Sequence, residues 1–158
     1  AWPLIKDFIW PSGLEHVAAT QLSLACHCWK NSYLSIDGDL QNRMKKVEGD
    51  NIWQIILEAS KIESSPQNLL KFKTLFIDSA ANTQQKIETV LNRYTDVLPN
   101  ELRVLAQSAI TQLSLAPVSY VFVVQNPTEQ GFYNQFVQII NVLEKLERPA
   151  HELQNITK

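Results

Sequence analysis

Glycine and proline are scarce in this sequence, with four and seven occurrences in 158 residues, and nearly all of them separate long stretches of helical apolar periodicity. Because both residues interrupt helices, their placement divides the chain into segments of helical length. Four isolated glycines cannot form the glycine-rich loops that hold phosphates in nucleotide-binding domains, nor the nucleophile elbow of the α/β-hydrolases. The scarcity therefore excludes these motifs and favours an all-α fold.

Histidine and cysteine are also scarce, with three and two occurrences. No histidine follows a glutamate by three residues, which excludes the Glu-x-x-His pairs of di-metal helical bundles. Cys26, His27 and Cys28 are the most compact group of potential ligands, but consecutive helical positions point about 100° apart, whereas zinc needs four converging ligands. We therefore predict no metal, no cofactor and no catalytic residue. We also expect two free thiols, which favour a cytoplasmic location.

Charge and long apolar runs are limited too. A formal net charge of −2 provides no basic patch for nucleic acid, so we expect no nucleic-acid partner. The longest apolar run, 118–124 with Ser119 inside it, is far too short to span a bilayer. Amides are abundant instead, with thirteen glutamines and eleven asparagines spread along the chain, as is typical of a neutral solvated surface. The alternative interpretation is a polar interface in which amides exchange hydrogen bonds with a partner.

Helix-capping patterns predict a single-domain bundle of five to seven helices over residues 12–148. Ser12, Asp50, Ser65 and Asn126 each stand where a cap is expected before an apolar-periodic stretch. From Pro66 to Leu98 neither glycine nor proline intervenes, which predicts one long helix, with a break near Asn82–Thr83 as the alternative. This helix and the next form a hairpin with its corner at Pro99 and almost no loop.

The segment Val118–Val124 is the only stretch whose density of β-branched residues is typical of a strand. No second run of similar quality is available to pair with it, and a lone buried strand would leave backbone groups unpaired. We therefore predict a short buried helix here. An edge strand paired across a dimer is the alternative, and Tyr120 and Phe122 are candidate partner-binding residues.

The two ends of the chain differ from the bundle in composition. Residues 1–11 form an apolar leader, in which Trp2, Phe8 and Trp10 are candidate partner-binding residues. The leader can fold back over one end of the bundle, or it can anchor the chain to a partner protein or a membrane, and any membrane contact is expected only through residues 1–10. After Pro149 we expect a short tail, 149–158, as a turn or frayed helix.

The sequence favours a non-enzymatic protein-interaction, scaffold or regulatory module within a larger chain or assembly, acting on another protein or on a second copy. The first alternative is a small-molecule-binding or catalytic bundle with an apolar pocket. Its expected lining is aromatic: Trp29, Trp53, Phe72, Phe76, Tyr94, Phe122, Phe132 and Phe136. The second alternative is the soluble part of a membrane-associated protein.

Overall fold

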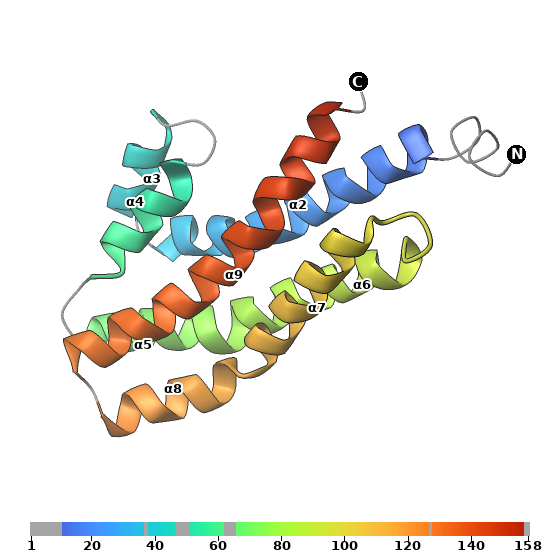
Figure 1. The fold of residues 1–158 in the computed structure, drawn as a ribbon. Coiled ribbons are helices and arrows are strands. Elements are labelled where there is room, and N and C mark those ends of the chain that lie inside the picture. The colour runs from blue at the N-terminus through green and yellow to red at the C-terminus, as the bar shows by residue number, and fades with distance from the viewer. Residues whose placement is uncertain (1–10, 37, 47–50, 62–65, 127, 157–158) are drawn as a thin grey trace, which may run out of the picture.

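The computed structural model describes residues 11–36, 38–46, 51–61, 66–126 and 128–156. Within these ranges the protein is an all-α bundle without strands, which confirms the predicted fold class (Figure 1). The predicted leader, including Trp2, Phe8 and Trp10, and the predicted caps Asp50 and Ser65 lie outside the described residues.

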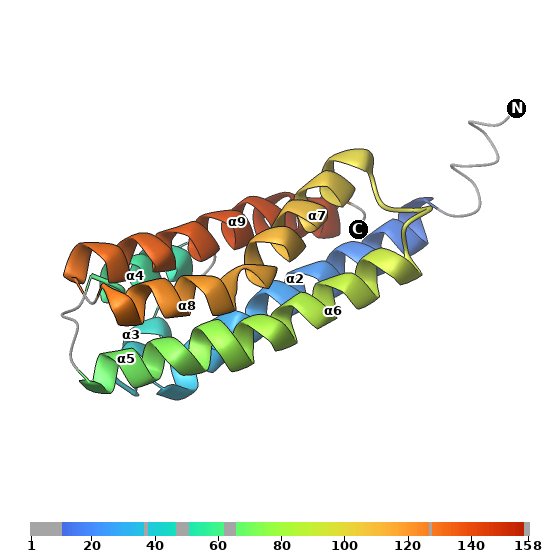
Figure 2. The ribbon, with the colours of Figure 1, turned by 90° about the horizontal axis from the view of Figure 1, so that it is seen from below.

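Four helices form the body of the bundle: α2 (Pro11–Ile36), α6 (Ala80–Arg93), α7 (Asn100–Ser114) and α9 (Glu129–Ile156). They pack in a closed cycle, α2 on α6, α6 on α7, α7 on α9 and α9 on α2. Neighbours in the cycle run in opposite directions (Figures 1 and 2), so the topology is that of an up-down-up-down bundle.

Two short excursions interrupt this cycle. The first contains α3 (Gly38–Met44) and α4 (Asn51–Ala59), which pack on each other, with α3 also against α2 and α4 against α9. The second is α8 (Ala116–Gln125), which follows α7 after a bend of 41° and runs alongside α9 and α5 (Figure 2).

The predicted hairpin is present, but its long helix is shorter than expected. α5 (Pro66–Lys73), the π-helical segment η1 (Thr74–Ser79) and α6 form one helical run that ends at Arg93. The backbone N–H groups of Val97 and Leu98 both donate to the carbonyl oxygen of Tyr94, at 3.1 and 3.0 Å, which turns the chain before Pro99. The corner therefore has a connection of several residues, whereas almost no loop was expected.

The irregularity in this run lies at η1, one to two turns before the predicted break at Asn82–Thr83. A π-helical segment inserts extra backbone into the turn and rotates the side chains that follow. Leu75, Phe76 and Ser79 are buried here, and the rings of Phe72 and Phe76 approach to 3.9 Å between centroids. The π segment thus contributes Phe76 to the core, one turn after Phe72 of α5.

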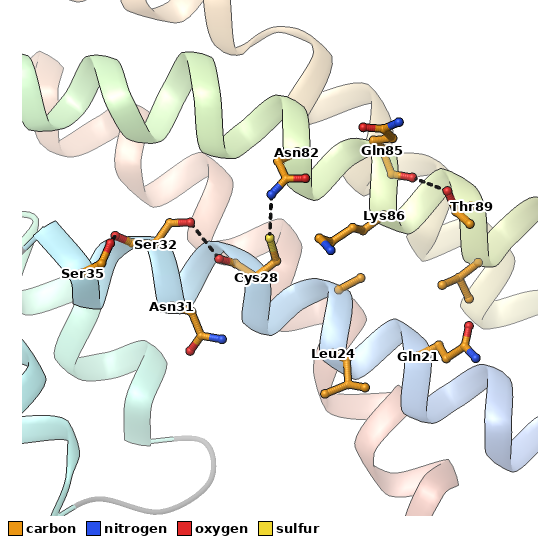
Figure 3. Close-up of a pocket in the computed structure, with 12 residues that line it drawn as sticks. Gln21, Leu24, Cys28, Asn31, Ser32, Ser35, Asn82, Gln85, Lys86 and Thr89 are labelled. Atoms are coloured by element: carbon orange, nitrogen blue, oxygen red, sulfur yellow. Dashed lines mark hydrogen bonds between the residues drawn. The ribbon is translucent and has the colours of Figure 1, made fainter.

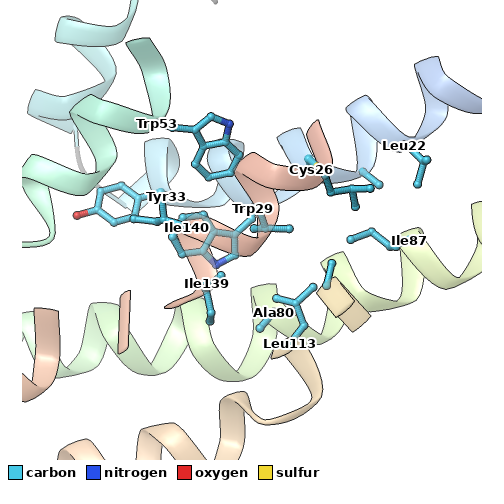
Figure 4. Packing of buried hydrophobic residues seen from close by; sticks show 14 of the residues in the cluster. Leu22, Cys26, Trp29, Tyr33, Trp53, Ala80, Ile87, Leu113, Ile139 and Ile140 are labelled. Atoms are coloured by element: carbon cyan, nitrogen blue, oxygen red, sulfur yellow. The ribbon is translucent and has the colours of Figure 1, made fainter. Parts of the chain in front are cut away.

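The core is rich in aromatic residues contributed by α2, α4, α5, η1 and α9. Figure 4 shows those of α2 and α4, Trp29, Tyr33 and Trp53. Trp29 stacks on Trp53 at 6.2 Å between centroids, and Phe136 meets Phe72 edge-to-face at 4.7 Å. These residues and Phe76 are at most 1% exposed. Five of the eight aromatic residues expected to line a pocket therefore fill the core against one another, while the side chain of Phe132 is outside the description.

Helix α9 differs from the prediction at both ends. Its cap is Thr128, whose Oγ1 accepts from the Gly131 N–H at 3.1 Å, whereas the predicted cap Asn126 ends α8. At the other end α9 continues through Pro149 to Ile156, so the predicted tail is largely helical. Ala150 is fully buried, and its burial helps to offset the hydrogen bond that proline removes.

Ser12 was also predicted to be a helix cap. It lies inside α2 instead, because the helix already includes Pro11.

Candidate interaction surface

Helix α8 is apolar around its whole circumference and contains no charged residue: its sequence is APVSYVFVVQ. A helix of this composition is ordinarily buried on all sides. Here only Ala116 and Val123 are fully buried, where α8 rests on η1, α9, α5 and α7. The prediction of a helix over 118–124 is therefore confirmed, but the prediction that it is buried is wrong, and the strand alternative is excluded.

The half of α8 that faces away from the bundle is exposed and apolar. Val118 is 67% exposed, Val121 51%, Phe122 50% and Val124 46%, and Leu115, directly before the helix, is 47% exposed. We call these five residues the α8 face. At 100° per residue they occupy the arc opposite Ala116 and Val123, and together they expose roughly 500 Å², near the upper limit of apolar patches on monomeric proteins.

No other helix shows a comparable concentration in the part of the chain that the structure describes. The remaining large exposed apolar side chains are distributed over three helices: Val17 and Leu24 on α2, Leu70 on α5 and Val104 on α7. Scattered residues of this kind are usual on a protein surface and indicate no binding site. The α8 face contains five of the nine.

Of the two candidate residues predicted on this segment, only Phe122 belongs to the α8 face. Tyr120 is partly buried and packs against the core. The prediction located the correct segment, but it expected a buried helix there. The feature that could have indicated the exposed face is that α8 has no polar side, so whichever half points outward is apolar.

A buried ion pair that we did not predict joins α2, α4 and α9. The Lys30 ammonium, on a residue 1% exposed, donates to Glu147 Oε1 at 2.7 Å. Glu147 Oε2 accepts from Trp53 Nε1 at 3.0 Å, and Lys30 Nζ lies 4.2 Å from the centroid of the Trp53 ring. Both carboxylate oxygens and the ammonium are thus engaged with protein groups, which suits a structural role.

Helical spacing could have located this pair. Lys30 follows Cys26 by four residues and precedes Tyr33 by three, so it lies on the buried stripe of α2. Glu147 follows the buried Leu143 by four residues on α9. A buried charge needs an opposite charge beside it, so Lys30 and Glu147 could have been expected to pair between α2 and α9.

His27 lies at the edge of this ion pair, with Nε2 3.7 Å from Glu147 Oε1. Burial and the nearby Lys30 ammonium lower its pKa, an effect that Glu147 opposes and His151 reinforces. The imidazole is therefore neutral at physiological pH. The described residues contain no group of three or more His, Cys, Asp or Glu side chains that could hold a metal ion.

The two cysteines are free thiols, as predicted, and they occupy different environments. Cys26 is fully buried, and burial raises the pKa of its thiol far above the ordinary value. Cys28 is partly exposed, and its Sγ accepts a hydrogen bond from Asn82 Nδ2 at 3.4 Å. The raised pKa keeps the Cys26 thiol protonated, so Cys26 is not an activated thiolate nucleophile.

A wide groove of about 840 Å³ runs between α2 and α6 (Figure 3). Its polar lining is dominated by side-chain amides and hydroxyls, and Lys86 is its one charged residue. Since the lining includes no carboxylate, no imidazole and no aromatic ring, it supplies neither a general acid–base pair nor an apolar pocket. The groove therefore gives no support to the alternative of a catalytic or small-molecule-binding bundle.

No single helix among the described residues is long and apolar enough to cross a membrane, although α7 and α8 together, bent by 41°, pass that test by length and composition. No family model, no curated protein and no solved structure significantly matches the chain.

Proposed function

We propose that this chain is a non-enzymatic protein-interaction module and that the α8 face is its binding surface. The observation that supports this proposal is the exposure of four large apolar side chains on one uncharged helix and of a fifth, Leu115, directly before it. Exposing such a face to water is unfavourable by about 25 cal/mol per Å², so roughly 500 Å² of it corresponds to about 12 kcal/mol of unrealised transfer free energy. A partner that covers the face would recover part of this free energy.

The proposal places the chain in the cytoplasm, because two unpaired thiols favour a reducing compartment. Trp2, Phe8 and Trp10 remain a predicted second contact with a partner.

Site-specific photo-cross-linking in the cells that express the protein tests this proposal. A photoreactive amino acid at position 118 is expected to form a covalent adduct with a protein. The matched control carries the same group at position 104, which is also a valine, is 59% exposed, and lies on α7 outside the α8 face. Adducts at neither position, or equally at both, would refute the proposed binding surface.

A further inference from the structure

We infer that the occupant of the α8 face is a second copy of this chain, paired with the first about a two-fold axis. This inference rests on the proposed function, because it names the partner of the same surface. Its expected form is an isologous dimer, in which the identical patch of each copy meets the other.

The size of the α8 face is compatible with a weak dimer. Roughly 500 Å² from each copy buries at most about 1,000 Å² in total, which is the lower limit for a specific interface. Interfaces of this size form transient complexes, so we expect a Kd on the order of tens of micromolar. A large obligate partner would need more apolar surface than this face provides.

The charge pattern permits self-pairing. In an isologous interface the same patch of both copies meets across the two-fold axis. A patch with charges of one sign therefore repels its counterpart on the other copy. The five residues of the α8 face are all uncharged, and so is the whole of α8. The face therefore has no like-charge repulsion to overcome when two copies meet, and it has no charges that would select an oppositely charged partner.

The spacing of the α8 face suits an antiparallel pair of helices. Leu115, Val118 and Phe122 follow one another at three- and four-residue steps along one side of the segment. Val118 lies between the other two and is the most exposed of the five. A two-fold axis beside Val118 brings the two Val118 side chains together and sets Leu115 of each copy against Phe122 of the other.

Charge exchange at Val118 tests this geometry by sedimentation equilibrium. The wild-type chain, of 18.0 kDa, is expected to show a concentration-dependent mass that approaches twice this value. Val118→Glu and Val118→Lys are each expected to remain monomeric, because two like charges meet at the axis. An equimolar mixture of the two variants is expected to restore the dimer, since opposite charges then face each other.

Val104→Glu and Val104→Lys are the matched controls, and they are expected to dimerise like the wild type. Circular dichroism of each variant checks its fold, which exposed positions should preserve. A wild-type chain that stays monomeric well above the expected Kd, variants that dimerise as well as the wild type, or a mixture that remains monomeric would each overturn the inference.

The cross-link at position 118 separates this inference from the proposed function. An adduct with the mass of two chains supports both. An adduct with a different protein or with lipid overturns self-pairing. The protein adduct leaves the proposed function standing, whereas a lipid-only adduct or the absence of any adduct refutes the proposed function as well.

Discussion

Neutralising Glu147 tests how strongly the buried ion pair determines the packing of α2 on α9. Glu147→Gln preserves the shape of the side chain and an acceptor for Trp53 Nε1, but it removes the negative charge that the Lys30 ammonium, on a residue only 1% exposed, contacts at 2.7 Å. Removing one partner of a buried pair typically costs about 3–5 kcal/mol. Since the free energy of unfolding of a small domain is about 5–15 kcal/mol, this loss is a large fraction of the total stability.

Glu144 offers a matched control on the same helix. Its carboxylate pairs with Arg148 at 2.8 Å, but the two side chains are 23% and 51% exposed. An exposed pair four residues apart contributes only about 0.3–0.5 kcal/mol, so Glu144→Gln should change the free energy of unfolding little. Urea unfolding followed by circular dichroism measures both variants against the wild type.

A double-mutant cycle completes the test. Lys30→Met leaves Glu147 with its Trp53 hydrogen bond and a side chain 11% exposed, so its cost should be smaller than that of Glu147→Gln. In the double variant neither charge remains, and its loss should fall short of the sum of the single losses by about 1–3 kcal/mol. If Glu147→Gln lowers the free energy of unfolding no more than Glu144→Gln, the reasoning about the buried pair is refuted.

Three further predictions follow from single side chains. Because the folded state lowers the pKa of His27, the unfolded chain binds a proton first as pH falls through the ordinary value of about 6.5. Stability should therefore be greatest above that pH and decline below it, and His27→Gln should reduce this decline in urea titrations; an unchanged slope would contradict the assignment. Pro149→Ala should raise the free energy of unfolding by about 1–2 kcal/mol, because alanine restores a helical hydrogen bond, and thermal unfolding that shows a lower stability would count against this. Iodoacetamide should modify Cys28 before Cys26, which is buried with a raised pKa, and comparable rates by mass spectrometry would disprove the difference.

The positions of proline and glycine predicted most of the helix boundaries. It located the end of α2 before Gly38, the start of α5 at Pro66 and the corner before α7. These boundaries are local, because they depend on backbone geometry within a few residues. The prediction was therefore correct at boundaries that local backbone sterics determine.

Tertiary packing decided the boundaries that were wrong. α9 continues past Pro149 because Ala150 behind it is buried, and η1 forms where Leu75 and Phe76 enter the core. Neither effect can be read from local propensity, since each depends on contacts with other helices.

The candidate surface was predicted only in part. The apolar segment 118–124 was predicted to be a buried helix, although every apolar residue of a helix can be buried only when neighbours surround it. Among the described residues, α8 packs on η1, α9, α5 and α7 with one side only, and its other side stays exposed. The sequence identified the unusual segment, and only the topology revealed which half of it is exposed.

Cysteine accessibility at position 118 tests the central claim most directly. In a chain whose two native cysteines are replaced by serine, Val118→Cys should react rapidly with a maleimide when the chain is isolated and dilute, because residue 118 is exposed. In intact cells the same position should react slowly because a partner covers it, while Val104→Cys should react rapidly in both settings. Equal reactivity of position 118 in the dilute chain and in cells would contradict the account.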